Sequence, residues 1–185
     1  YRDLGHVYAR MGEDERAIEC YEKDLDLAVE MGDGPGEGRA CGRLGAMYHS
    51  AGEYRKAIAL YEREASRAAE RGDQPGQGFA YSNLGSAWLD LGEPARAVDY
   101  LVQELAIGRA LGDTSGRARA LDVLGCAYRK VGRYDEAIEC HEAHLGMALE
   151  EQGDKAGQGR AHSGLGCAYA CLGRYEQAIE AHTQH

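Results

Sequence analysis

A Leu-Gly pair returns along this chain at intervals of 40, 40, 40 and 41 residues, and no other feature limits the possible folds as strongly. The pairs are Leu4-Gly5, Leu44-Gly45, Leu84-Gly85, Leu124-Gly125 and Leu165-Gly166. Self-similarity at a fixed period of this length is typical of a solenoid, in which each unit buries its apolar face only against its neighbours. The sequence therefore predicts one array over 1–185, in which a surface, not a pocket, makes the functional contacts.

Each unit has the pattern of two helices joined by tight turns. An aromatic residue stands three positions after the glycine of each pair, at Tyr8, Tyr48, Trp88, Tyr128 and Tyr169. A second glycine follows at Gly12, Gly52, Gly92, Gly132 and Gly173, and four units close with Gly-Asp at Gly32-Asp33, Gly72-Asp73, Gly112-Asp113 and Gly153-Asp154. Glycine is favoured just past the last turn of a helix, so these residues predict helix ends.

The resulting units lie near 1–32, 33–72, 73–112, 113–153 and 154–185, with the first and last truncated. The first helix of each unit is predicted near 1–11, 34–51, 74–91, 114–131 and 155–172. The second helix is predicted near 14–31, 54–71, 94–111, 134–152 and from 174 onward. The chain begins inside a first helix and stops inside a second, so we expect a fragment of a longer array whose ends expose apolar stacking surface.

Helix starts carry their own signals. Asp73 is a strong N-cap for the helix that follows it, and the chain's three prolines all fall in first turns, where a missing N–H is tolerated: Pro35, Pro75 and Pro94. The glycine of each Leu-Gly pair lies inside a helix, where it costs roughly 1 kcal/mol against alanine. A cost repeated in every unit indicates close approach of a neighbouring helix. Further glycines, such as Gly36 and Gly76, predict weak and mobile first turns.

The Leu-Gly pair, the aromatic residue, the later Ala-Ile and the tight helical hairpin resemble the tetratricopeptide repeat, although the usual unit of that family has about 34 residues. Units of 40 residues reading G-R-A-x-x-x-L-G, Y-x-x-A-I and G-D are similar to the long repeats of the Pins/LGN group of adaptors. The resemblance implies an all-α, right-handed α-solenoid of antiparallel helix pairs. It also implies that the first helices line a concave groove.

Composition limits the other possibilities. There is no apolar run of about 18 residues that predicts a membrane span and no leader typical of secretion, so we expect a cytoplasmic protein with no membrane partner. The net charge of −10 opposes binding to nucleic acid.

The six cysteines are expected to be free, semi-buried packing residues, because several occupy equivalent places in the repeat. The equivalent pairs are Cys20 with Cys140, and Cys126 with Cys167. Two sharper alternatives are metal sites made by Cys167, Cys171 and His162, or by Cys140, His141 and His144. Both lack the second close pair typical of zinc sites, and no metal or other cofactor is predicted.

No catalytic site is predicted. His141 and His182 stand where other units have Tyr21, Tyr61 and Leu101, which favours a packing role. No glycine-rich stretch follows a strand to hold a phosphate.

The charge pattern indicates a partner. The predicted first helices hold ten Lys or Arg against four Asp or Glu, whereas the rest of the chain holds 11 basic and 27 acidic residues. If the first helices line a groove, as the resemblance implies, that groove prefers acidic ligands. The side chains implied to point inward are Arg39, Phe79, Arg119 and Arg160, then Arg43 and Asn83, and then His6, His49, Arg129 and Lys130.

Two functions follow as hypotheses. The first is an adaptor whose groove binds an acidic, extended peptide through arginine–carboxylate pairs. The second is a structural spacer or self-assembling array that makes contacts by its ends and ridges. The alternative reading of the arginines is that they pair only with neighbouring acids. Of the asparagines that bracket Leu-Gly in the Pins/LGN group, only Asn83 is present, so partners of that group cannot be carried over.

Overall fold

The computed structural model describes residues 1–151 and 154–184, and over these ranges the chain forms ten α-helices and no strand. The first helices of the five repeats are α1 (Arg2–Met11), α3 (Gly34–Ser50), α5 (Gln74–Asp90), α7 (Thr114–Lys130) and α9 (Lys155–Cys171). The second helices are α2 (Asp14–Glu30), α4 (Tyr54–Glu70), α6 (Pro94–Leu111), α8 (Tyr134–Glu150) and α10 (Tyr175–Thr183). The all-α class and the order of helices are as predicted, and the predicted turn residue Gly153 lies outside the described residues.

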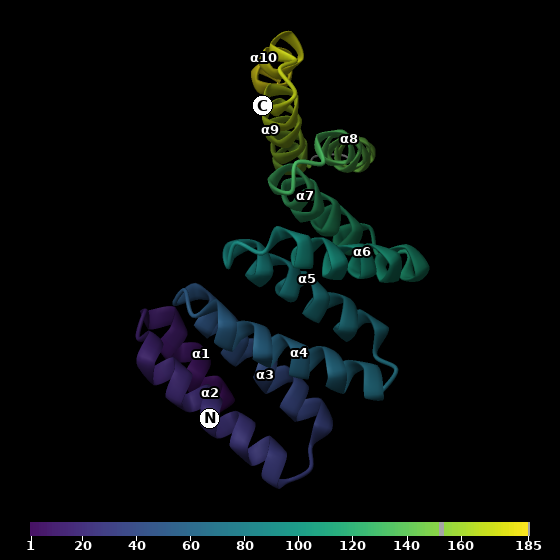
Figure 1. Ribbon diagram of the computed structural model, residues 1–185. Coiled ribbons are helices and arrows are strands. Elements are labelled where there is room, and N and C mark those ends of the chain that lie inside the picture. Colours follow the sequence, from purple (N-terminus) through teal and green to yellow (C-terminus); the bar gives the residue numbers. More distant parts are fainter. Residues whose placement is uncertain (152–153, 185) are drawn as a thin grey trace. The chain divides into compact units, whose positions relative to one another are not determined.

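The helices form two compact units (Figure 1). Unit 1 comprises Tyr1–Leu91 and holds α1 to α5, and unit 2 comprises Gly92–His185 and holds α6 to α10. In unit 1, α3 packs against α2, α4 and α5; in unit 2, α7 packs against α6, α8 and α9. First helices of successive repeats therefore touch each other at α3 and α5 in unit 1 and at α7 and α9 in unit 2. The single array over 1–185 stays a prediction.

Helix ends follow the glycine and aspartate signals. The glycines predicted to end helices adopt positive φ in the described part of the chain: Gly12, Gly32, Gly52, Gly72, Gly92, Gly112, Gly132 and Gly173. At Gly52, φ is 78°, a value that a side chain would strain. Tight turns thus occur where the sequence predicts them.

Four aspartates cap first helices by accepting a hydrogen bond from the backbone N–H three residues later. The pairs are Asp33 with Gly36, Asp73 with Gly76, Asp113 with Gly116 and Asp154 with Gly157, at 2.8–2.9 Å. In each pair the carboxylate occupies the space that a Cβ on the glycine would need. These glycines therefore have a packing role in the capped turn, and their mobility stays a prediction.

The glycine inside each first helix makes room for a ring. A Cβ on Gly45 would lie 2.7 Å from the Tyr61 ring, and one on Gly125 would lie 2.5 Å from His141. Gly5 faces Tyr21 and Gly166 faces His182 in the same way. The predicted close approach is confirmed at these four glycines, and a side chain of the second helix, not its backbone, makes it.

Leucines and alanines that recur with the repeat make up most of the core. Leu44, Leu84, Leu124 and Leu165 are all buried, whereas Leu4 on α1 is 47% exposed. Val7 and Met11 are also exposed on α1, as are Tyr175 and Ile179 on α10. The predicted exposure of apolar side chains on the terminal helices is confirmed.

Candidate functional site

The ten predicted binding residues all lie on first helices, at exposed or half-buried positions. We call the surface that they mark within each compact unit the first-helix face. Its part in unit 1 contains His6, Arg39, Arg43, His49, Phe79 and Asn83. Its part in unit 2 contains Arg119, Arg129, Lys130 and Arg160.

In unit 1, Arg39 and Arg43 line a pocket of about 340 Å³ together with Arg2. Asp24 of α2 also lines this pocket, and its Oδ2 lies 3.5 Å from Arg43 Nη1. Arg39 is exposed, and within the described ranges no carboxylate lies within ion-pair distance of it. Arg2 is paired as well, with Asp3, so the pocket joins two paired arginines and the unpaired Arg39.

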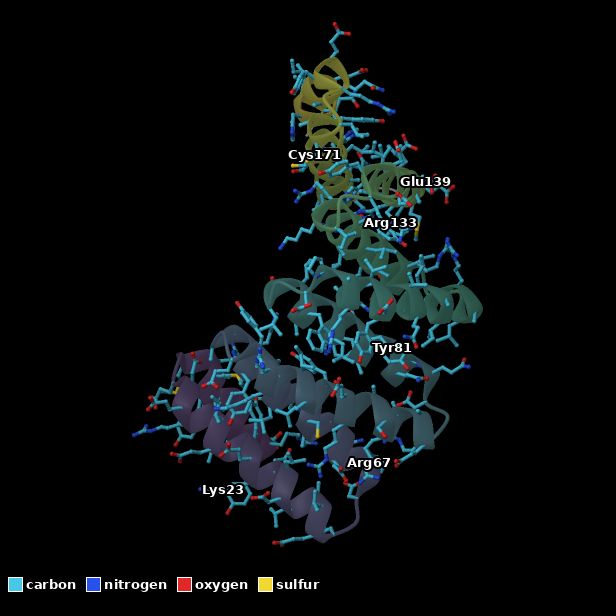
Figure 2. All side chains as sticks on the ribbon, viewed as in Figure 1. Lys23, Arg67, Tyr81, Arg133, Glu139 and Cys171 are labelled. Carbon is cyan, nitrogen blue, oxygen red and sulfur yellow. The ribbon has the colours of Figure 1, made fainter. Side chains whose placement is uncertain are left out.

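The apolar lining of this pocket comes from Leu27 and Ala28 of α2 and from Met31, which directly follows that helix. One repeat later, the place of Leu27 is held by Arg67, which is labelled in Figure 2. The Nε atoms of Arg67 and Arg63 lie 2.9 and 2.6 Å from the buried Glu37 carboxylate of α3, and these bonds lower the pKa of Glu37. The pocket therefore occupies the place that the first turns of α3 fill in the following repeat.

Two histidines of unit 1 are held by their neighbours. His6 Nδ1 lies 3.1 Å from the Tyr21 hydroxyl, which reaches it past Gly5. His49 Nε2 lies 3.0 Å from Asp90 Oδ2, so this contact joins α3 to α5. Phe79, at the repeat position of Arg39, is 53% exposed. Unit 1 thus presents an apolar ring as well as cations.

Asn83 does not stand alone on α5. Its side chain is hydrogen-bonded to Glu64 of α4, whose Oε2 atom is buried and has no hydrogen-bond partner. Burial raises the pKa of the Glu64 carboxyl to about 7, against the opposing effects of Asn83 and the nearby Arg43. The carboxylate also fills the space beside Gly42, where a Cβ would collide with it.

In unit 2, two of the predicted arginines pair with acids. Arg119 Nη2 lies 2.9 Å from Oε1 of Glu104 on α6, a residue that is only 2% exposed. Arg160 Nε lies 3.4 Å from Asp122 Oδ2 on α7. The other oxygen of Asp122 lies 3.8 Å from Nδ1 of the buried His144 on α8. The alternative reading of the arginines, pairing with neighbouring acids, thus holds for Arg43, Arg119 and Arg160.

Arg129 and Lys130 differ from these arginines. They close α7, and no carboxylate of the described residues lies within ion-pair distance of either. Basic side chains in the last turn also interact favourably with the negative end of the helix dipole. These two cations remain available to a ligand.

One set of equivalent residues on the second helices was not predicted from the sequence. We call this set, residues 24, 64, 104 and 144, the register. Residues 24, 64, 104 and 144 are 40 residues apart, and each reaches a polar residue of a first helix. Three of the four are acids, Asp24, Glu64 and Glu104. The repeated acid was the available signal, but periodicity alone does not say which helix a side chain faces.

His141 and His144 are both buried on α8, and among the described residues their four ring nitrogens have no hydrogen-bond partner. Burial lowers the pKa of His141 to about 4 and also lowers that of His144. The predicted packing role of His141 is confirmed, since its ring lies between Gly125 and Gly164.

Over 1–151 and 154–184, no group of three or more His, Cys, Asp and Glu side chains could hold a metal ion. Neither alternative metal cluster is therefore assembled. The six cysteines are free; Cys20, Cys41 and Cys140 are buried, and Cys171, labelled in Figure 2, is exposed. No helix in the described part of the chain is long and apolar enough to cross a membrane.

Repeated helical hairpins, capped by aspartate and ended by glycine, define an α-solenoid of helix pairs. The family model of the tetratricopeptide repeat matches residues 1–70, 76–150 and 116–185. This chain belongs to the tetratricopeptide repeat family.

Solved structures of similar fold include BtubC (BKLC) from P. vanneervenii, with 22% identity, a TM-score of 0.86, and coverage of 96% of this chain and 74% of that one. MamA has 26% identity and a TM-score of 0.75, over 100% of this chain and 93% of MamA. YrrB has 22% identity and a TM-score of 0.69, over 100% and 82% of the two chains. No curated protein matches this chain in sequence.

Proposed function

We propose that this chain is a non-catalytic, cytoplasmic interaction scaffold that binds an acidic, extended segment of a partner protein on its first-helix face. Arg39, Arg129 and Lys130 carry the proposal, because within the described residues they have no carboxylate partner. Arg43, Arg119 and Arg160 add cations whose charge is partly balanced. YrrB, which shares the fold, is described as a protein with an unusual peptide-binding site, and this supports the class of function proposed. The Pins/LGN grouping stays a prediction.

The peptide is expected to pair its carboxylates with the arginine side chains in a bidentate manner. Exposed Phe79 offers an apolar surface to a residue beside those carboxylates. Because exposed ion pairs are screened by salt, binding in the micromolar range should weaken as ionic strength rises.

The test is fluorescence anisotropy with a labelled, glutamate-rich decapeptide. We expect Arg129→Glu to weaken binding about tenfold, since it removes one attraction and adds one repulsion on the first-helix face. Arg55→Glu is the matched control, because Arg55 is exposed on the second helix α4 and the change in net charge is the same. Equal effects of the two variants, or binding that salt does not change, would contradict the proposal.

A second function is favoured by a separate observation, the exposed apolar side chains of α1 and α10. Self-assembly through these helices makes the chain a spacer, not a receptor for peptides. Light scattering over a range of concentrations should then reveal oligomers that Val7→Glu disperses. A monomer at every concentration would exclude this function.

A further inference from the structure

One residue per repeat on the second helices contacts a polar residue of a first helix from behind the first-helix face. Asp24, Glu64, Glu104 and His144 occupy the same register, and their partners are Arg43, Asn83, Arg119 and Asp122. Each pair joins a second helix to a first helix of the same compact unit. The register therefore lies where it influences the face without forming its outer surface.

Burial differs along the register. Glu104 and His144 are 2% and 1% exposed, whereas the side chain of Asp24 is 26% exposed. The basic partner is more accessible than the acid in the Glu104 pair, because the Arg119 side chain is 44% exposed. A ligand on the face would thus meet the arginine directly and feel the acid only through its field.

We infer that the two register acids that face an arginine, Asp24 and Glu104, determine how strongly the first-helix face attracts acidic ligands. Each of these two acids balances the arginine in front of it, and a neutral residue in its place would leave that arginine to the ligand. The inference rests on the proposed function and adds to it the residues that set its specificity.

The fourth position shows the other arrangement that the repeat permits. His144 is neutral because burial lowers its pKa, and the acid that balances Arg160 is Asp122, on the first helix itself. Asp122 is 25% exposed and stands at the repeat position of Gly42 and Ser82. When the register residue carries no charge, the balancing acid thus lies at the surface that a ligand meets.

Two opposing effects decide the sign of the expected change. Removing the acid loosens the arginine, and ordering part of that side chain on binding weakens affinity by about twofold. It also removes a negative charge that repels the ligand's carboxylate, and at an intermediate effective dielectric constant the loss of this repulsion tightens binding by about sixfold. The electrostatic gain exceeds the entropy loss, so neutralising the acid should tighten binding.

The experiment compares buried and exposed acids on the same helix. Glu104→Gln is expected to bind the labelled glutamate-rich decapeptide about threefold more tightly than wild type. Asp99→Asn is the control, since Asp99 is exposed on α6 and gives the same change in net charge. The control should leave affinity within about twofold, because a distant exposed charge is screened. Equal affinities of the two variants, or weaker binding by Glu104→Gln, would overturn the inference.

Asp24→Asn provides a second comparison where burial is lower and unfolding is less of a concern. Its control is Asp26→Asn, at an exposed position two residues further along α2. We expect a gain of about twofold for Asp24→Asn, since Asp24 is more exposed than Glu104 and its pair with Arg43, at 3.5 Å, is longer than the Glu104 pair. No gain relative to Asp26→Asn would count against the register.

A measurement without the peptide separates this inference from the proposed function. The Nε–H resonance of Arg119 is followed by NMR while acetate is added as a carboxylate probe. Acetate should shift this resonance at lower concentration in Glu104→Gln than in Asp99→Asn. If the peptide binds no variant but acetate behaves in this way, the proposed function fails and the inference stands. If wild type binds the peptide but the acetate responses are equal, only the inference fails.

Discussion

Unit 1 and unit 2 build the same joint between helices with different rings. In unit 1, Tyr21 and Tyr61 fill the space beside the interior glycines of α1 and α3, whereas His141 and His182 do so beside α7 and α9 in unit 2. The Tyr21 hydroxyl reaches a hydrogen-bond partner, but both nitrogens of His141 are buried without one. The repeats thus share the packing of a ring against an interior glycine, whereas the rings differ in their hydrogen bonding and in their pKa values.

The two units consequently contain buried groups whose pKa values are shifted in opposite senses. Burial raises the pKa of Glu64 in unit 1 to about 7 and lowers that of His141 in unit 2 to about 4. Both shifts disfavour the charged form, yet one group is charged at high pH and the other at low pH. The same physical cause therefore predicts opposite responses to acid.

The largest expected effect is that a fall in pH from 7 to 4.5 increases the contribution of Glu64 to stability and decreases that of His141. Glu64 binds its proton more tightly when folded, so its contribution is complete below its unfolded pKa of about 4.5 and is lost as pH rises to about 7. His141 binds its proton less tightly when folded, so its contribution is complete above about 6.5 and is lost as pH falls towards 4. Each change is worth on the order of 3 kcal/mol.

Hydrogen exchange of the whole chain, read separately for peptides of each unit, measures both contributions. Acidification should raise protection in unit 1 relative to Glu64→Gln and lower it in unit 2 relative to His141→Tyr. The charged and titratable groups that face Glu64 are Cys41, Arg43 and Tyr61, and those that face His141 are Asp122, Arg129 and His144. Variants with the same pH dependence as wild type would refute the comparison.

The next largest effect is the loss of stability when an interior glycine is replaced, and it should be equal in the two units. Gly45→Ala and Gly125→Ala each place a Cβ against a buried ring, and overpacking of this kind costs about 2 kcal/mol. Gly146→Ala is the control, because Gly146 lies within α8 and nothing lies within 4 Å of its Cβ position. It should stabilise the chain by about 1 kcal/mol through helix propensity. Urea denaturation measures all three, and a destabilising control would undermine the packing explanation.

The smallest effect concerns the caps, which are the same in both units. Asp73→Ala and Asp113→Ala should each destabilise the chain by about 1 kcal/mol, since each removes a side-chain acceptor at a helix start. Adding Gly76→Ala to Asp73→Ala should recover part of the loss, because the carboxylate that excludes a Cβ is then absent. Thermal melts measure the effect, and a larger loss in one unit would indicate that the caps also differ.

The repeat itself explains how much could be predicted from the sequence. Gly52, Asp73 and Pro75 act within one turn of chain, so their roles follow from local rules and the structure bears them out. The interior glycines required a partner, and the sequence predicted its approach but not that Tyr61 or His141 would supply it. That identity depends on the angle between two helices, which no local signal encodes.

Less of the candidate binding surface could be predicted. All ten residues lie on first helices at exposed or half-buried positions, but their availability depends on the acids behind them. Arg119 and Arg129 have the same charge and lie on the same helix, yet only Arg119 faces Glu104. A count of basic and acidic residues along the chain does not distinguish Arg119 from Arg129. Their difference arises from which turn of a second helix faces which turn of a first.

The turn glycines have a consequence for how such a chain can change. At Gly12, Gly52, Gly92 and Gly132, nothing lies within 4 Å of the position of a Cβ. Insertions at these points would meet open solvent, and exchange of one repeat for another there would disturb no packed atom at the junction. The turns are therefore natural crossover points for recombination. A lineage could exchange register residues such as Glu104 as whole cassettes, changing ligand preference while the helix joints stay intact.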